Sequence, residues 1–452
     1  MGVERLAVLD RRRAGVLAHL ASLQWPLGRG GRAFIDWLAA AGFTVWQFLP
    51  LGPTGADRSP YFARSDFAGS AALLDPAEPP GDAADQAAFL ESCGHWLEDY
   101  ALFEAASEAC AGAPWWNWPA PLRDRSAQAL QQLRTERSAR IEQVRTEQLA
   151  FFVQWRRLRA YAHARGVRLF GDLPFYIGPM SAETWTDREQ FQLTAQGQPA
   201  AVAGVPPDYF SAGGQVWGNP LYDWPAMQRD GFTFWRARVR AQFERVDLLR
   251  VDHFRAFVAH WAVPAGAPDA RGGRWCASPG RDLLERLRQE WGALPIVAED
   301  LGVITPDVTA LRQAFSLPGM RVLQFAFDGS PDNPHLPQHY GADCVAYTGT
   351  HDNDTTLGWY ETLEAATRQY VDRMLGLTSQ SVPESIVRVV LESAAPLAVI
   401  PLQDLLGLGS EARLNTPGTH SWRNWRWRVP EGALTEERAA HWAALNKTCT
   451  RL

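Results

Sequence analysis

The chain has 452 residues, 46% of them hydrophobic and 21% charged, with a formal net charge of −6. This length can bury a large core and supports one big domain with insertions, or two to three domains. No basic face stands out to follow a phosphate backbone, and no apolar run reaches membrane-spanning length, so neither nucleic acid nor a membrane is an expected partner.

Eight apolar segments alternate with helical patterns along the chain. Several of them are continuous apolar runs that end in a polar residue, which is typical of strands buried in a parallel sheet. The clearest helical patterns are Phe34–Ala41, Phe151–Arg165, Phe232–Glu244, Arg281–Trp291 and Pro306–Phe315. Eight strand–helix repeats predict a closed (β/α)8 barrel, a TIM barrel of the α/β class. The expected strands are Ala14–Leu23, Thr44–Pro50, Val167–Phe175, Leu248–Asp252, Pro295–Gly302, Met320–Phe327, Cys344–Asp354 and Ala398–Asp404.

Two long segments interrupt this alternation after the second and third expected strands. Residues 70–150 are rich in Ala, Arg, Glu and Gln and carry few strand signals, which predicts a mostly helical insertion. Residues 176–230 are dense in Gly, Pro and aromatic residues, which indicates an irregular but ordered insertion. Long ordered loops inside a domain are usually functional. We therefore expect residues 1–452 to form one catalytic barrel domain that carries both insertions.

Three carboxylates stand at the ends of three expected barrel strands: Asp252, Glu299 and Asp352. The C-terminal ends of barrel strands converge, so these side chains can share one cleft. Cleavage of a glycosidic bond with retention needs two carboxylates about 5 Å apart, one as nucleophile and one as acid/base. Arg250 would keep Asp252 ionised, and crowding by Asp252 and Asp352 would raise the pKa of Glu299. The alternative is an ordinary ion pair between Arg250 and Asp252 that only caps the strand.

Cysteine and histidine usage argues against other kinds of site. The five cysteines are an odd number without any C-x-x-C pair, which fits a reduced, cytoplasmic protein. Arg11–Arg13 imitates a twin-arginine export signal, but His19 interrupts the apolar run that follows, so a buried first strand is favoured. His335 and His339 have a metal-like spacing, but Pro337 breaks the helix that would align them, and no metal is expected.

The 20 tryptophans are an unusually large share for a chain of this length. Flat indole rings stack on sugar rings, whose axial C–H faces are apolar, although any single indole more often fills a core. The clusters Trp115–Trp118 and Trp422–Trp427 are harder to bury entirely, because each of them mixes indoles with polar residues.

Several motifs resemble those of a known family. Arg250-Val251-Asp252, Ala298-Glu299-Asp300 and His351-Asp352 resemble the conserved regions of the α-amylase superfamily. Longer stretches, occurring together in one order, are similar to the amylomaltases, a family of 4-α-glucanotransferases or disproportionating enzymes. The resemblance runs from about Ala14 to the C-terminus. The stretches that carry it are Ser59–Tyr61, Gly171–Pro174, Val205–Ser211, Gln215–Pro220, Val297–Gly302, Thr348–Asp354 and Gly409–Asn415.

The resemblance implies a role for each candidate site residue. Asp252 is expected to be the nucleophile, Glu299 the acid/base and Asp352 the stabiliser of the transition state. Four residues are expected to bind the sugar at the cleavage point: Tyr61, Asp172, Arg250 and His351. Four more substrate-binding residues are expected on a loop that arches over the cleft and on a loop opposite it: Asp208, Trp217, Asn219 and Asn415.

These observations together predict a cytoplasmic transferase without a cofactor. It would move segments of α-1,4-glucan from a donor to the 4-hydroxyl of an acceptor glucan or glucose, by a retaining double displacement. The expected partners are maltooligosaccharides and α-glucans derived from starch or glycogen. Two alternatives stay open: an α-1,4-glucan hydrolase, in which water takes the second step, and a glucan-binding barrel without catalysis. The segments His19–Leu23 and Asp75–Asp85 depart from the family pattern, the second by being abbreviated, and both lie outside the catalytic set.

Overall fold

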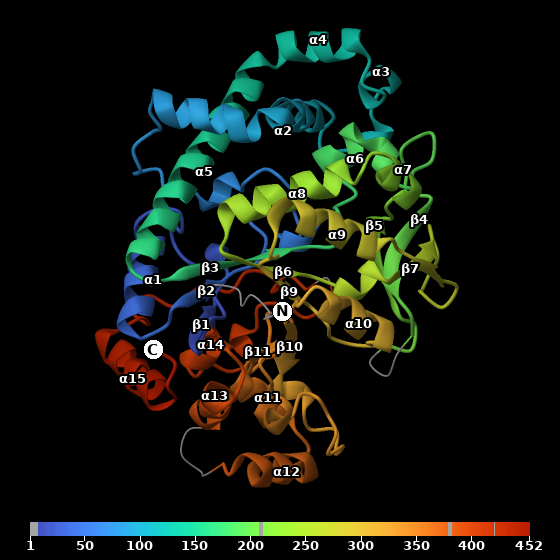
Figure 1. Cartoon of the computed structure of the whole chain (residues 1–452). Helices are drawn as coiled ribbons and strands as arrows, with labels where there is room; N and C mark the ends of the chain where they lie inside the picture. Colours follow the sequence, from blue (N-terminus) through green and yellow to red (C-terminus); the bar gives the residue numbers. More distant parts are fainter. Residues whose placement is uncertain (1–7, 208–210, 378–381, 420) are drawn as a thin grey trace.

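The centre of the computed structural model, which describes residues 8–207, 211–377, 382–419 and 421–452, is an eight-stranded parallel sheet (Figure 1). The last gap is bridged where the backbone N–H of Ala298 donates to the carbonyl of Pro318 at 2.8 Å. The sheet therefore nearly closes on itself, which confirms the predicted TIM barrel. In spatial order the strands are β1 (Arg13–Leu17), β2 (Val45–Gln47), β3 (Arg168–Leu173), β6 (Leu248–Val251), β9 (Ile296–Ala298), β10 (Gly319–Val322), β11 (Cys344–Tyr347) and β12 (Leu397–Pro401).

The barrel strands are shorter than the apolar runs predicted. The sixth expected strand ends at Val322, where a 3-10 helix, Leu323–Phe325, takes over. The eighth ends at Pro401, and α14 (Leu402–Leu405) follows at once. An apolar run alone does not distinguish a strand from a buried helical turn, which explains the overextended prediction. The chain consequently leaves the barrel early at its carboxyl end, where the loops gather.

Successive strand side chains alternate between the barrel interior and the surrounding helices. Trp46 of β2 faces outward, because its ring meets that of Phe34 on α1 (Arg29–Ala40) with centroids 5.0 Å apart. Its neighbour Val45 belongs to a separate buried cluster on the opposite face of the strands, which is the barrel interior. The members that strands contribute to this cluster are Leu17, Val45, Phe170, Leu248, Val297, Met320, Val322, Val345, Tyr347, Leu397 and Val399.

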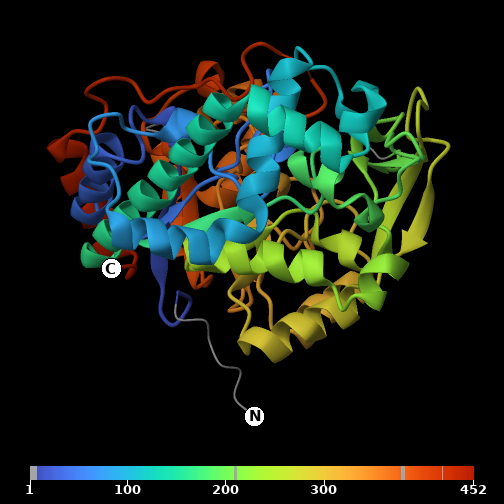
Figure 2. The same ribbon diagram turned by 90° about the horizontal axis from the view of Figure 1, so that it is seen from above.

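Helices cover the outside of the barrel (Figures 1 and 2). Three of the predicted helices, α8 (Thr233–Arg245), α9 (Gly280–Trp291) and α10 (Pro306–Ala314), are found within one residue at each end. None of the helices in the described part of the chain is both long enough and apolar enough to cross a bilayer. The remaining outer helices are α11 (Thr356–Thr362), α12 (Ala365–Leu375), α13 (Val382–Glu392) and α15 (Glu436–Thr448).

A layer of helices between β2 and β3 stands apart from the barrel (Figure 1). It contains α2 (Ala83–Ala109), α3 (Ala120–Arg123) and α4 (Ala127–Glu136), and it ends in α5 (Ser138–Ala164), which returns the chain to the barrel. This last helix was expected to start at Phe151 and begins much earlier. The preceding residues contain neither Pro nor Gly, so nothing interrupts the helix.

A second sheet, of four antiparallel strands in the order β5-β4-β7-β8, lies beside the barrel (Figure 1). Two of its strands fall within residues 176–230, where the sequence predicted irregular structure, and that description was wrong. The Ala-, Gly- and Pro-containing β4 and β5 have weak strand propensity, and β4 is fixed by pairing with β7, far later in the chain. The elements are β4 (Ala201–Val205), β5 (Gln215–Pro220), β7 (Ala259–Pro264) and β8 (Arg274–Ala277), with α6 (Ala182–Thr186) and α7 (Trp224–Arg229) on either side of β4 and β5.

Arg238 of α8 fastens the barrel wall to the segment that follows β3. Its side chain is fully buried, pairs with Asp66 at 2.6 Å, and donates to the carbonyls of Pro174 and Phe175 at 2.7 and 3.1 Å. Arg238→Leu leaves the Asp66 carboxylate without its partner, so we expect unfolding to need about 3–5 kcal/mol less than in the wild type. Urea unfolding followed by circular dichroism measures this.

The matched control for Arg238 lies on the same helix. Arg236 also pairs with a carboxylate, that of Glu290 at 2.7 Å, but its side chain is 31% exposed. Partly exposed pairs contribute about 0–1 kcal/mol, so Arg236→Leu should barely move the unfolding midpoint. Equal effects of the two substitutions would contradict the special role of Arg238.

Candidate active site

Each of the three predicted catalytic carboxylates lies at the carboxyl end of a barrel strand. Asp252 directly follows β6, Glu299 directly follows β9, and Asp352 lies in the turn after β11. The loops of Asp252 and Glu299 are joined through the backbone, because the N–H of Phe254 donates to the carbonyl of Glu299 at 3.1 Å. Chemistry in TIM barrels sits at this end.

Arg250 connects two aspartates inside the barrel mouth. Arg250 and Asp172 each stand two residues after an interior side chain, so the strand alternation turns both inward. Arg250 Nη1 donates to both carboxylate oxygens of Asp172 at 2.8 and 2.7 Å, and Nη2 donates to Asp252 Oδ1 at 2.8 Å. Burial opposes the charge of Arg250, but the two aspartates hold its pKa well above the ordinary value. Asp252 therefore faces a permanent positive charge.

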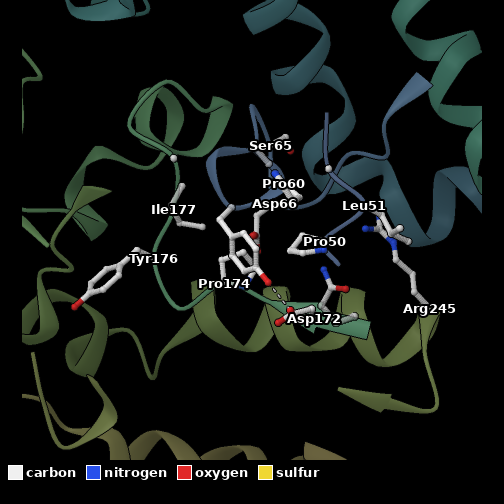
Figure 3. A pocket seen from close by; sticks show the side chains of 15 residues that line it. Pro50, Leu51, Pro60, Ser65, Asp66, Asp172, Pro174, Tyr176, Ile177 and Arg245 are labelled. Carbon is white, nitrogen blue, oxygen red and sulfur yellow. Dashed lines mark hydrogen bonds between the residues drawn. The ribbon is translucent and has the colours of Figure 1, made fainter. Parts of the chain in front are cut away.

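Tyr61 completes this group from the loop after β2. Its hydroxyl donates to Asp172 Oδ2 at 2.7 Å, and Ser59 fixes its backbone by accepting from the Tyr61 N–H. Burial, and then the charge of Asp172, raise the pKa of Tyr61 well above the ordinary value, so its phenol stays protonated. Tyr61 and Asp172 line a cavity of about 20 Å³ beside Pro50 and Tyr176, which is room for roughly one water or hydroxyl (Figure 3).

Glu299 is fixed in a buried position by two backbone N–H groups. Its Oε2 accepts from the backbone N–H of His253 at 2.7 Å, and its Oε1 accepts from that of Leu301 at 3.0 Å. Burial raises the pKa of Glu299 to about 8, and the charge of Asp252 adds to this rise. The crowding by Asp252 and Asp352 that the sequence predicts is therefore only part of the cause. Burial contributes most to the raised pKa of Glu299, and the charge of Asp252 comes second.

His253 adopts a backbone conformation that is uncommon for a residue with a side chain. Its φ is +49°, in the left-handed region. This turn directs the His253 N–H at Glu299, immediately after Asp252 in the chain. Strained backbone of this kind tends to occur at functional sites, where the surrounding structure enforces it.

Asp352 is fixed by a segment from near the C-terminus. Asn415 Nδ2 donates to Asp352 Oδ1 at 2.7 Å, and His351 Nε2 lies 3.3 Å from the other carboxylate oxygen. Arg413 donates to the carbonyls of both Asp352 and Asn415, each at 2.7 Å. The side chain of Asp352 nevertheless stays 43% exposed, so it can meet a ligand.

An aromatic group covers one side of the mouth. The His351 ring stacks on Tyr61, with centroids 5.3 Å apart and planes inclined by 17°. Trp425 lies 5.9 Å from each of these rings. Arg413 and Trp425 are not among the site residues predicted from the sequence, although they lie in the stretches Gly409–Asn415 and Trp422–Trp427.

The residues expected on the loop that arches over the cleft differ from one another in their surroundings. Trp217 of β5 packs edge-on against the ring of His253, with centroids 4.8 Å apart, which places its indole beside the residue that follows Asp252. Asn219 is buried and donates to the carbonyl of Ile177 at 3.0 Å, so its amide holds β5 in place. Its contact with substrate stays a prediction. Asp208 lies outside the described residues.

Candidate metal ligands are engaged in other contacts. His335 Nδ1 accepts from the N–H of Val322 at 3.1 Å, and His339 Nε2 lies 2.8 Å from the carbonyl of Pro331. Within the described residues, no three His, Cys, Asp or Glu side chains are grouped so that they could hold a metal ion.

Comparison with known proteins places this constellation in a family. A family model described as 4-alpha-glucanotransferase matches residues 18–80 and 77–435. The chain belongs to the 4-alpha-glucanotransferase family. The 4-alpha-glucanotransferase of Thermus thermophilus is 43% identical over 497 residues, covering 98% of this chain and 99% of that protein. The chloroplastic/amyloplastic 4-alpha-glucanotransferase of Solanum tuberosum is 38% identical, covering 93% of this chain and 83% of that protein.

A solved structure of the same family agrees with the fold. Amylomaltase from Streptococcus agalactiae, in complex with acarbose, superposes with a TM-score of 0.92 at 30% sequence identity, covering 98% of this chain and all of that one. The two pieces of the family match meet at residues 77–80, inside the stretch Asp75–Asp85 that is expected to be abbreviated.

Proposed function

We propose that this chain transfers segments of α-1,4-glucan from a donor to the 4-hydroxyl of an acceptor glucan or glucose. The observation that carries the proposal is a pair of carboxyl groups in different surroundings, one bonded to an arginine and one buried. Arg250 bonds to Asp252, while burial raises the pKa of Glu299 to about 8. Retaining cleavage of a glycosidic bond needs one carboxyl group ionised and the other protonated. The names of the relatives, 4-alpha-glucanotransferase and amylomaltase, support the same activity.

The first step forms a glucosyl-enzyme. A carboxylate oxygen of Asp252 attacks the anomeric carbon, and the bond from that carbon to the leaving O4 breaks. Glu299 gives its proton to that oxygen, and the shortened donor leaves. Asp352 would stabilise the positive charge that develops on the sugar ring, and His351 and Tyr61 would hold the ring.

The second step reverses the first with a new sugar. The 4-hydroxyl of the acceptor attacks the anomeric carbon, Glu299 takes the hydroxyl proton, and Asp252 leaves as a carboxylate. The proposed partners are therefore maltooligosaccharides and longer α-glucans. All five cysteines are free, which supports a reducing compartment such as the cytoplasm.

A hydrolase is the competing function, because it shares the first step. Transfer wins over water only where the site binds and aligns the acceptor, since well-oriented groups reach effective concentrations far above that of bulk water. Trp217, next to His253, supports such alignment from one side of the mouth, and Trp425 from another. A glucan-binding barrel without catalysis would not require the protonated Glu299.

Maltotriose distinguishes these functions. We expect glucose together with a ladder of longer maltooligosaccharides and almost no net gain of reducing ends, because transfer conserves the number of glycosidic bonds. Chain-length analysis beside a reducing-end assay measures both. If reducing ends rise in step with glucose and no product exceeds the starting length, the protein is a hydrolase.

Trp217→Ala should shift the balance toward water. Removing the indole opens the mouth beside the glucosyl-enzyme, so we expect the ratio of hydrolysis to transfer to rise about tenfold, the effect of losing one well-placed contact. The control is Trp291→Ala, which should leave the ratio unchanged. Trp291 is the last residue of the outer helix α9, and its half-buried indole packs against Phe243. An unchanged ratio in Trp217→Ala would show that this indole does not align the acceptor.

A further inference from the structure

Trp422 is an exposed indole that the catalytic group does not explain. Its exposed fraction is 74%, against 36–57% for the other exposed large hydrophobic residues of the described chain. Tryptophan is normally among the well-covered side chains, because its large apolar surface is costly to leave in water. A single exposed apolar residue is not by itself a site. The surroundings of Trp422 decide what it can do.

The position of Trp422 places it at the barrel mouth. It stands three residues before Trp425, whose ring lies 5.9 Å from the rings of His351 and Tyr61. Three residues of extended chain span at most about 11 Å, so the backbone of Trp422 lies within that distance of Trp425. A glucan held at the catalytic carboxylates therefore needs only a few further sugar units to reach Trp422.

The segment around Trp422 is anchored to the catalytic centre. The N–H of Trp425 donates to the carbonyl of Leu414 at 2.8 Å, and Asn424 Oδ1 accepts from the N–H of Thr416 at 3.3 Å. Leu414 in turn lies between Arg413 and Asn415, the two residues that bond to Asp352. The exposed indole is thus part of a segment with fixed connections to the site.

The chemistry around the indole suits a neutral sugar chain. Trp422 offers an apolar ring face, which matches the C–H face of a pyranose. The Arg423 guanidinium lies 5.6 Å from the centre of the Trp422 ring and supplies hydrogen-bond donors for sugar hydroxyls. Arginine with an exposed indole can also stack on a single-stranded nucleic acid. The net charge of −6 and the continuity with the catalytic mouth favour the glucan.

We propose that Trp422 is an outer binding platform for α-glucans, contacted only by chains longer than those the catalytic centre itself holds. This inference rests on the proposed transfer function. It predicts a length-dependent effect: Trp422→Ala should lower kcat/KM for maltoheptaose about tenfold, mainly through KM, and leave kcat/KM for maltotriose within about twofold. Trp422→Phe, which keeps a flat ring, should retain most of the activity on the long chain.

The experiment compares wild type, Trp422→Ala, Trp422→Phe and the control Trp291→Ala on both substrates. Wild-type transfer on maltotriose is read first, because its absence would overturn the proposed function whatever Trp422 does. Equal loss on both substrates would show that Trp422 only supports the catalytic segment. No loss on either substrate would show that Trp422 does not bind the glucan. The fluorescence of Trp422 is measured as the difference between wild type and Trp422→Ala. If a single-stranded oligonucleotide quenches this fluorescence and maltoheptaose does not, the inference is also overturned.

Discussion

Asp252→Asn is expected to give a folded protein whose turnover of maltotriose is at least roughly a thousandfold lower, as for the loss of other covalent nucleophiles. The amide keeps the shape of the carboxylate but lacks the charge that attacks the anomeric carbon. The fold should tolerate the change, because Arg250 keeps both of its bonds to Asp172. Initial rates of glucose release, normalised to the folded fraction, measure the effect.

Asp172→Asn provides the comparison that separates a nucleophile from a structural ion pair. The Asp172 side chain is fully buried, while that of Asp252 is 31% exposed, although both bond to Arg250. Arg250 keeps Asp252 as a partner in Asp172→Asn, but the lost pair is the fully buried one, so this substitution should reduce the free energy of unfolding more than Asp252→Asn does. A destabilised Asp252→Asn protein that retains its activity would mean that Asp252 only caps the strand.

The sequence predicted where the candidate catalytic carboxylates lie, because their positions depend on local pattern. A buried strand ends where its apolar run meets a polar residue, and parallel strands of a barrel bring these ends together. Asp252 and Glu299 therefore needed only the strand assignment to be placed correctly. The inward direction of Asp172 and Arg250 follows from the same alternation of side chains.

What the sequence did not predict depends on contacts between distant segments. Arg413 reaches Asp352 from a loop some sixty positions later, and nothing local to either residue indicates the bond. Likewise, β4 pairs with β7 although the barrel strand β6 lies between them in the sequence, so neither strand is defined by its local sequence alone. The size of the pKa shift of Glu299 was also not predictable from the sequence. Its main cause is burial in the assembled barrel mouth, and neighbouring charges, which the sequence does reveal, come second.

The second large effect concerns the proton on Glu299. The proposed first step needs this carboxyl protonated, and a pKa of about 8 keeps it so at neutral pH. Activity should therefore hold up to about pH 8 and fall as the pH rises through that value, because deprotonation removes the acid. We expect kcat/KM for maltotriose to fall roughly tenfold per pH unit on the alkaline side. A pH–rate profile between pH 5 and 10 tests this, with the folded fraction checked at each point.

Glu299→Ala should separate the acid from a structural role. On a glucosyl donor whose leaving group needs no proton, the variant should keep its first-step rate within about tenfold of wild type, and the alkaline fall should disappear. On maltotriose the same variant should lose roughly a thousandfold or more. Glu290→Ala, which removes a surface carboxylate bonded to Arg236, is the control and should change neither rate. Equal losses on both donors would mean that Glu299 holds structure or substrate.

In the proposed second step Glu299 acts as a base, and the loss of the charge on Asp252 would explain how the same residue can change roles. In the glucosyl-enzyme Asp252 is a neutral ester, so the repulsion that helps to raise the pKa of Glu299 disappears, while Arg250 continues to lower it. Glu299 should therefore lose its proton at a lower pH in the intermediate than in the free enzyme. Breakdown of the intermediate by an acceptor should reach its full rate below pH 8, where the first step is still undiminished. Trapping the glucosyl-enzyme with an activated donor and following its decay with maltose across the pH range measures this difference. If formation and decay titrate at the same pH, the charge of Asp252 does not control the switch from acid to base.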